Sequence, residues 1–372
     1  MTFPVLLSKQ LIMCLIGLIL IYIAIKKNCE PMLLLPIGFG TVLVNLPAST
    51  VINYEQPGLG MVNGAIEWLY DVGIASSEIL PLLLFIGIGA MIDFSPLIKR
   101  PVMFLFGFAA HIGIFVVAGL AGILGFHAND ALSIGIIGAA DGPTAILVSQ
   151  SLGSSYIGAI TVAAYSYMAL VPLIQPAVIR LLTSAKERRI HMTHTSSVVD
   201  IRARILFPII VTIISGIIVP MSIPLVGFLM FGNLIRECGV LEKMSVTAQN
   251  ELTNIITLLL GLTLSFNMKA DYFLRWDTFL VLALGLLAFA LNICFGIFSA
   301  KIYNLFAKEK INPLVGAAGI SAFPMAARIS QKMAQTEDCS NIILMQAAGA
   351  NVAGQIASAM AGGLIIRLAA II

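Results

Sequence analysis

The sequence predicts an all-α, polytopic membrane protein with about nine or ten transmembrane helices in two inverted repeats, each with a re-entrant or broken hairpin. Hydrophobic residues make up 59% of the chain and charged residues 10%, and the mean hydropathy is +1.01, which leaves too little polar surface for a soluble globule. A segment interrupted by glycine and proline at 138–150 (GAADGPTAILVSQ) also returns at 319–331 (GISAFPMAARISQ). Such paired, interrupted segments indicate an internal repeat.

Hydrophobic runs predict the membrane helices in chain order. The first run, 11–25, resembles a signal-peptide core, but two lysines follow it and no small-residue cleavage site is evident, so we interpret it as a retained helix. Runs of spanning length predict helices at 9–25, 32–49, 79–98, 101–125, 155–182, 205–222, 251–266 and 277–307. Weaker or broken runs lie at 131–151, 224–238, 312–333 and 341–367.

The charges of the loops predict how the chain is oriented. Lysine and arginine accumulate on the cytoplasmic side of membrane proteins. We therefore expect the loop 50–77, which lacks both, to lie outside. The basic segments expected inside are 26–27, 99–100 and the linker 183–204.

This orientation predicts two oppositely inserted hairpins. Because helix 101–125 leads outward and helix 155–182 must run inward, the segment 131–151 has to enter and leave on one face, with its bend at 141–143. The segment 312–333 then enters from the cytoplasm. Lys269 and Arg275 fall outside in this arrangement, contrary to the positive-inside rule.

Three units follow from this arrangement. Residues 1–182 form the first membrane repeat with its leading helix, residues 183–204 form a cytoplasmic basic linker, and residues 205–372 form the second, inverted repeat.

Several function classes are excluded by missing motifs. The five cysteines contain no CxxC pair and the four histidines show no HExxH spacing, so we expect neither a disulfide framework nor a transition-metal site. There is no GxxxxGK[ST] phosphate loop, which gives direct drive by ATP no support. The net charge of +3 is small and no basic patch is interleaved with aromatics, so we expect no nucleic-acid partner.

Asp141 is the strongest candidate for a functional residue. In a soluble loop Asp141-Gly142-Pro143 would indicate a surface turn, but here apolar and small residues flank it on both sides. An ionisable group at membrane depth is costly, and irregular backbone there must line a protein-enclosed or watery site. We predict a buried carboxylate ligand, since hard cations prefer oxygen donors.

The second repeat supplies further polar candidates. Asn312, Gly316 and Ser321 precede or form the second bend, and Asn351 lies inside an apolar helix, where its amide needs a ligand or a neighbouring helix as partner. Asn312 is also placed to cap a helix that starts at Pro313. Arg328 either extends to the cytoplasmic interface or pairs with a carboxylate, from a substrate or from Asp141.

Two tyrosines lie in the middle of helix 155–182. Tyr165 and Tyr167 are compatible with simple aromatic packing, and their hydroxyl groups are also suited to relaying a proton or contacting a cation.

A series of motifs in the chain resembles the β subunit of sodium-pumping biotin-dependent decarboxylases. The likeness extends from about residue 30 to the C-terminus, and so many ordered motifs make it specific. These motifs are PMLLLPIGFG at 31–40, GIGAMIDF at 87–94, GAADGPTA at 138–145, AYSYMALVP at 164–172, MFGNLIRECG at 230–239, KEKINP at 308–313 and NVAG at 351–354.

The resemblance implies a membrane subunit that decarboxylates carboxybiotin, exports sodium and consumes a proton. It implies that Asp141, Asn312, Ser321 and Asn351 bind sodium, the only metal expected. It also implies catalytic roles for Asp141, Arg328, Tyr165 and Tyr167, with Gly142, Pro143 and Gly316 shaping the hairpin backbone.

The resemblance further implies an oligomeric complex in the inner membrane of a bacterial cell. Its partners would be a biotin carboxyl carrier subunit, a carboxyltransferase α subunit and a small membrane γ or δ subunit, in contact with membrane lipid. No Ala-Met-Lys-Met biotin acceptor occurs in this chain, so biotin would be carried by a separate subunit. The alternative function is a sodium-coupled secondary transporter without decarboxylase activity, which the same architecture would suit.

Overall fold

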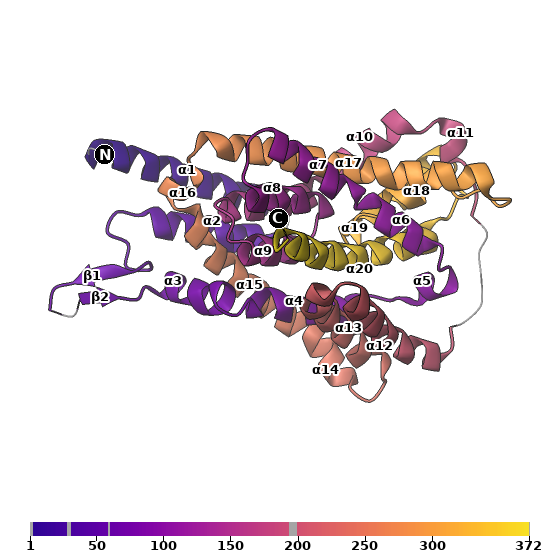
Figure 1. Ribbon diagram of the computed structural model, residues 1–372, viewed down its shortest axis with the longest axis horizontal. Coiled ribbons are helices and arrows are strands. Elements are labelled where there is room, and N and C mark those ends of the chain that lie inside the picture. The colour runs from indigo at the N-terminus through magenta and orange to yellow at the C-terminus, as the bar shows by residue number, and fades with distance from the viewer. Residues whose placement is uncertain (1–2, 28–30, 59, 193–198, 372) are drawn as a thin grey trace.

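The computed structural model describes residues 3–27, 31–58, 60–192 and 199–371, and it is an elongated bundle of helices (Figure 1). In the described residues the only β structure is one short antiparallel pair, β1 (Tyr54–Gln56) with β2 (Gly60–Val62). The predicted all-α fold is therefore confirmed. Apolar side chains exposed along the outer helices fit a chain surrounded by lipid.

The first half runs from the N-terminus to the linker and contains one broken hairpin. Its helices are α1 (Phe3–Lys27), α2 (Pro31–Asn45), α3 (Ala65–Tyr70), the π-helix η1 (Asp71–Ala75), α4 (Ile79–Met91), α5 (Ser95–Lys99), α6 (Met103–Ala110), α7 (Ile112–Ile123), α8 (Ala128–Gly135), the 3₁₀-helix η2 (Ile136–Ala139), α9 (Gly142–Ser151) and α10 (Ile157–Leu182).

The second half follows the linker helix α11 (Ala185–Arg188) and contains the other broken hairpin. Its helices are α12 (Ile201–Ile218), the 3₁₀-helix η3 (Pro220–Ser222), α13 (Ile223–Glu237), α14 (Glu242–Thr247), the π-helix η4 (Ala248–Leu252), α15 (Thr253–Leu264), the 3₁₀-helix η5 (Ser265–Met268), α16 (Ala270–Phe273), α17 (Trp276–Phe306), α18 (Pro313–Ala317), α19 (Met325–Glu337) and α20 (Leu344–Ala369).

The two halves pack against each other reciprocally. Helix α2 of the first half lies on α15 of the second, while α13 of the second lies on α4 of the first. In the same way α10 packs on α17, and α20 packs on α6. A five-residue π-helix precedes α4 in one half and α15 in the other. Reciprocal packing of this kind fits two related halves, as the repeated sequence segment indicates. The division into units at 1–182, 183–204 and 205–372 stays a prediction.

The described residues contain six helices that are long and apolar enough to span a membrane, or up to eight when two bent pairs are each counted as one span. The predicted number of about nine or ten also counted α2 and interrupted segments, which are shorter. One bent pair lies within α10, which turns by 68° between its halves. Pro172 explains this bend, because its ring clashes with the carbonyl group four residues earlier.

The predicted outer loop 50–77 and two of the predicted inner segments, 99–100 and the start of the linker, lie at opposite ends of the molecule. Strands β1 and β2 lie at one end, and α5 and α11 lie at the other (Figure 1). Near the strands, Lys269 forms an ion pair of 3.4 Å with Glu67, and Arg275 forms one of 3.6 Å with Asp277. These partners offset the two positive charges that depart from the positive-inside rule.

Candidate functional site

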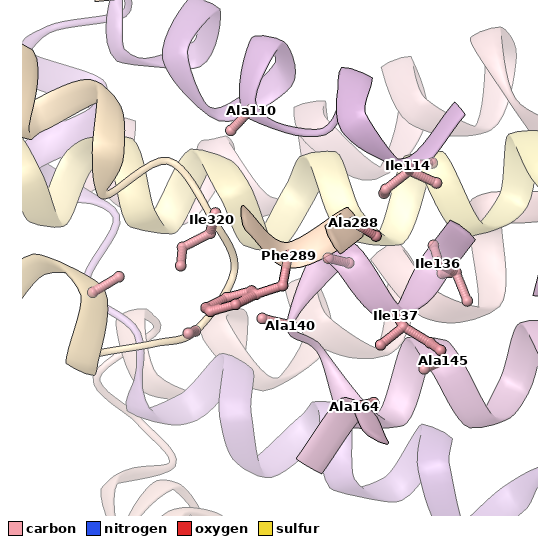
Figure 2. Packing of buried hydrophobic residues seen from close by; sticks show 14 of the residues in the cluster. Ala110, Ile114, Ile136, Ile137, Ala140, Ala145, Ala164, Ala288, Phe289 and Ile320 are labelled. Carbon is pink, nitrogen blue, oxygen red and sulfur yellow. The ribbon is translucent and has the colours of Figure 1, made fainter. Parts of the chain in front are cut away.

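The bends of the two broken hairpins meet inside the bundle. Ser321 in the second bend donates both its backbone N–H, at 3.3 Å, and its hydroxyl group to the carbonyl oxygen of Ala139 in the first. Around this crossing, Figure 2 shows the fully buried side chains of Ala140, Phe289 and Ile320. The two segments that the sequence repeat singled out therefore form one structural unit.

Amide side chains from neighbouring helices satisfy the exposed backbone of the bends. Asn292 of α17 donates to the carbonyl of Gly138 at 2.6 Å, and Asn351 of α20 donates to that of Ile320 at 2.6 Å. Gln355 of α20 donates to the carbonyl of Ser321, and Gln175 of α10 to those of Ala317 and Ala326. Irregular backbone at membrane depth requires such partners.

Each of these amides leaves its oxygen buried and without a hydrogen-bond partner among the described residues. The four atoms are Gln175 Oε1, Asn292 Oδ1, Asn351 Oδ1 and Gln355 Oε1. An unpaired buried acceptor costs about 1–3 kcal/mol, and a bound cation removes that cost. The interior around the bends is consequently rich in oxygen atoms that lack a donor.

Asp141 lies at the first bend, at the start of α9, with only 4% of its surface exposed. Its Oδ2 accepts hydrogen bonds from Thr144 Oγ1 at 2.5 Å and from Ser358 Oγ of α20 at 2.9 Å. The preceding Ala140 adopts a left-handed conformation, with φ +56°, and this turn directs the chain into α9. The positive end of the α9 dipole also favours a carboxylate here.

A cavity of about 460 Å³ opens beside Asp141. It brings together six of the residues predicted from the sequence, namely Asp141, Gly142, Pro143, Tyr165, Ser321 and Arg328. Gly142 is required by close packing, since a Cβ atom there would lie 2.0 Å from Cζ of Tyr165. Gln355, Thr253 and Thr257 add polar groups to the same wall, and residues of α2 and α4 add apolar ones.

Arg328 is exposed on the cavity wall. Within the described part of the chain, its guanidinium group forms no ion pair with Asp141. The predicted pair with Asp141 is therefore not formed, while extension to the interface and pairing with a substrate carboxylate both stay predictions for Arg328.

Four predicted residues lie outside this cavity. Asn312 caps α18 by accepting a hydrogen bond from the N–H of Leu314 at 3.1 Å, and its amide donates to the linker. Tyr167 donates to the carbonyl of Leu282 at 2.5 Å, and Gly316 packs against Gly296 of α17. Asn351 lies behind the second bend through its bond to Ile320. For Asn312 the structure favours the helix-cap alternative, and for Tyr167 it favours packing.

Sequence reasoning missed several residues that contact the site. Gln355 and Ser358 follow Asn351 at helical spacings of four and seven, so the three lie on one face of α20. This polar stripe in an otherwise apolar helix is readable in the sequence. Thr144, Thr253 and Thr257 give no such signal, because threonine is common in membrane helices, where its hydroxyl bonds to its own backbone.

Comparison with known proteins identifies the family. The sequence model of the family described as "Na+-transporting oxaloacetate decarboxylase beta subunit" matches residues 9–369. The chain belongs to this family. The oxaloacetate decarboxylase beta chain of Klebsiella pneumoniae is 42% identical, with 97% of this chain and 95% of the relative aligned.

Relatives with other substrates in their names are equally similar. The methylmalonyl-CoA decarboxylase subunit beta of Propionigenium modestum is 46% identical over 96% of this chain and 94% of its own length. The glutaconyl-CoA decarboxylase subunit beta of Acidaminococcus fermentans is 44% identical over 96% and 92%.

Membership places the chain among the β subunits of sodium-transporting, multi-subunit decarboxylases, and the helices that can span a membrane agree with this. It favours the decarboxylase over a secondary transporter without enzyme activity. The resemblance found in the sequence motifs is thereby confirmed.

Proposed function

We propose that this subunit decarboxylates carboxybiotin, presented by a separate subunit, and uses the reaction to export sodium while consuming a proton. The observation that carries the proposal is that the buried carboxylate residue Asp141 and the exposed residue Arg328 line the same cavity. One group suits a cation, and the other suits a carboxylate. Family membership supports coupling between the two.

In this proposal sodium binds to oxygen atoms around the first bend. Asp141 supplies the carboxylate, Ser321 its hydroxyl and Gln355 its buried, unpaired Oε1, and all three residues line the cavity. Asn351 does not line the cavity, but it holds the second bend through its hydrogen bond to Ile320, and its unpaired Oδ1 is a further ligand in this proposal. Asn312 positions α18 through its cap instead of contacting the ion, which changes the role that the resemblance implies for it.

Arg328 holds the substrate carboxylate in this mechanism. The N–CO₂⁻ bond breaks once that carboxylate is removed from water, CO₂ leaves, and the electron pair stays on the ureido nitrogen, which takes up a proton. Tyr165 lines the same cavity, and in this mechanism its hydroxyl group relays that proton. Tyr167 acts only through packing, because its hydroxyl is committed to the carbonyl of Leu282.

Decarboxylation must supply the work of moving sodium outward. One elementary charge moved against 100 mV requires about 2.3 kcal/mol. The crossing of the two bends offers the moving element, since any change at Ser321 alters the bond to Ala139 beside Asp141. The cation site and the substrate site are thus linked through one short stretch of backbone.

The complex would contain a biotin carboxyl carrier subunit, a carboxyltransferase α subunit and a small membrane γ or δ subunit, in the inner membrane of a bacterial cell. The relatives' names show that the upstream acid differs within this family. We assign the choice of acid to the carboxyltransferase, because in this proposal the group that enters the Asp141 cavity is carboxybiotin, which is the same for every acid.

The test is Asp141→Asn in the complete complex reconstituted into vesicles, with decarboxylation and sodium uptake measured together. We expect both to be lost, because the amide carries no charge to offset that of the ion. Asp130→Asn is the matched control, since Asp130 is also a buried carboxylate on the first hairpin but bonds to Ser154 at 2.7 Å. Sodium-dependent decarboxylation retained by Asp141→Asn would refute the assignment.

A further inference from the structure

The far end of the first hairpin is tied to another part of the molecule by two side-chain pairs. Tyr70, the last residue of α3, donates its hydroxyl group to Oε1 of Gln150 at 2.9 Å, and Ser151 donates to Oε1 of Glu78 at 2.6 Å. Gln150 and Ser151 are the last two residues of α9, the helix that begins directly after Asp141. The two pairs therefore connect this helix to the end of α3 and the start of α4.

The repeated sequence segment makes Gln150 comparable with Gln331, because both copies of the segment end in Ser-Gln. Among the described residues, Gln331 bonds to the connection between α19 and α20. It donates to the carbonyl of Asn341 at 3.0 Å and accepts from the N–H of Ile343 at 2.7 Å. Gln150 instead accepts from Tyr70, which lies outside the hairpin. The first hairpin thus has an attachment that the matching glutamine of the second does not make.

The ring of Tyr70 is held in place by the second half of the chain. It packs on the ring of Phe266 in η5, with 4.7 Å between the centroids, and only 7% of Tyr70 is exposed. Lys269 Nζ lies 3.8 Å from the centroid of the same Phe266 ring and pairs with Glu67 of α3. Lys269, which departs from the positive-inside rule, therefore fastens η5 to the helix that carries Tyr70.

The backbone at Glu78 brings α3 and α4 to the same place. Glu78 adopts the left-handed conformation, with φ +52°, which is uncommon for a residue with a Cβ atom. It lies at a bend of 66° between the helices at 65–75 and 79–91. Such backbone persists where the surrounding structure requires it. Here the bend lets Tyr70 and Glu78 bond to adjacent residues at the end of α9.

The two pairs lie beyond the Asp141 cavity, towards the end of the molecule that carries β1 and β2 (Figure 1). The residues of α4 that line the cavity are Leu84, Ile88 and Met91. The cavity therefore follows the later part of α4 to its last residue, next to α5. Nearer the strands, Leu80 of α4 and Ile146 of α9 are buried in one apolar cluster with Tyr70. A path from Asp141 to the strand end would cross this cluster and then the two bonded pairs.

We propose that Tyr70 and Glu78 are positioning residues of an outer seal, formed by the Tyr70–Gln150 and Glu78–Ser151 pairs. The seal holds α9 against α3 and α4, and a sodium ion at Asp141 reaches the outer surface only after both pairs separate. The proposal rests on the proposed function, in which sodium leaves on this side. The Tyr70–Gln150 bond is partly buried and contributes more than the exposed Glu78–Ser151 bond, because water competes for exposed groups.

The experiment uses the complete complex in vesicles loaded with radioactive sodium. It measures passive sodium efflux without substrate, and the sodium accumulated per CO₂ released during turnover. Tyr70→Phe keeps the ring on Phe266 and removes only the hydroxyl group. It should raise passive efflux about 2- to 10-fold, the effect of one hydrogen bond between neutral groups, and lower the sodium accumulated per CO₂.

A second variant separates the seal from a general loss of structure. Gln150→Leu removes the other partner of the same bond, so it should also raise passive efflux. The double variant Tyr70→Phe/Gln150→Leu should raise it no further than the larger single effect, because the two substitutions break one interaction. Tyr272→Phe is the matched control. Tyr272 lies 6.4 Å from Phe266, ring to ring, but among the described residues its hydroxyl group makes no hydrogen bond to α9.

The outcomes distinguish the seal from the proposed function. If the wild-type complex releases CO₂ and accumulates no sodium, the proposed function fails and the seal fails with it. If the wild type accumulates sodium but Tyr70→Phe keeps wild-type efflux and wild-type sodium per CO₂, only the seal is refuted. Equal effects of Tyr272→Phe, or additive effects of Tyr70→Phe and Gln150→Leu, would also refute it.

Discussion

Replacing Gln355 by leucine tests whether this side chain binds sodium or only holds the backbone of the second bend in place. Gln355 lines the Asp141 cavity and donates to the carbonyl of Ser321, and its buried Oε1 has no hydrogen-bond partner among the described residues. We take the contact between the amide oxygen and the ion to be as strong as a hydrogen bond to a charged group, about 1.5–3 kcal/mol. This corresponds to about a tenfold to hundredfold change in affinity. We therefore expect Gln355→Leu to raise the sodium concentration for half-maximal decarboxylation by that factor.

The chain offers a matched control in Gln175. Its amide also donates to hairpin carbonyls, of Ala317 and Ala326, and its Oε1 is also buried without a partner, but it does not line the Asp141 cavity. Gln175→Leu should lower thermal stability and leave the sodium dependence unchanged. The assay is CO₂ release against sodium concentration, with uptake of radioactive sodium into vesicles. Equal shifts for both variants, or none for Gln355→Leu, would show that Oε1 is not a ligand.

Two further substitutions test the surroundings of Asp141. Ser358→Ala removes a donor, 2.9 Å from its Oδ2, that favours the ionised, sodium-bound carboxylate, so half-maximal sodium should rise about tenfold in the same assay. Gly142→Ala places a Cβ atom 2.0 Å from Cζ of Tyr165, which should cost about 1–3 kcal/mol and lower the melting temperature of the purified complex. It should also reduce turnover, because the ring or the bend must shift.

Each of these variants has a control of the same chemical type. Ser149→Ala removes a hydroxyl that bonds only within the first hairpin, to the carbonyls of Ala145 and Ile146, and it should leave half-maximal sodium unchanged. Gly122→Ala adds a Cβ atom with nothing within 4 Å and should not lower the melting temperature. A normal sodium response in Ser358→Ala, or an undiminished melting temperature in Gly142→Ala, would contradict the geometry.

Much of the fold was predictable because the lipid environment restricts the chain so strongly. Long apolar runs have few alternatives to helices, and an unexplained carboxylate such as Asp141 stands out among them. The repeat also predicted that the second bend would matter, and Ser321 lies against the first. Local composition was enough for these conclusions, because each follows from the cost of leaving backbone polar groups or charges unsatisfied in lipid.

The partners of Asp141 could not be predicted, because they depend on how α20 rotates against the first hairpin. Ser358 is an ordinary serine in the sequence, and only packing turns its hydroxyl towards Oδ2. Asn312 shows the reverse problem, since an asparagine before a proline has the same sequence signature as a helix cap and as a ligand. The linker that its amide reaches has no local pattern that indicates where it folds.

The hydrogen bonds from Ser321 to Ala139 bear on how tightly a pump of this kind is coupled. Because each bend satisfies the backbone of the other, a hairpin that moved alone would leave polar groups stranded in a medium that cannot solvate them. Such half-completed states, in which an ion could slip back without any chemical turnover, are raised in free energy. Under the proposed function, this architecture would suppress leakage because partial motion has the highest free energy, and the atoms that shape the site would also protect the ion gradient.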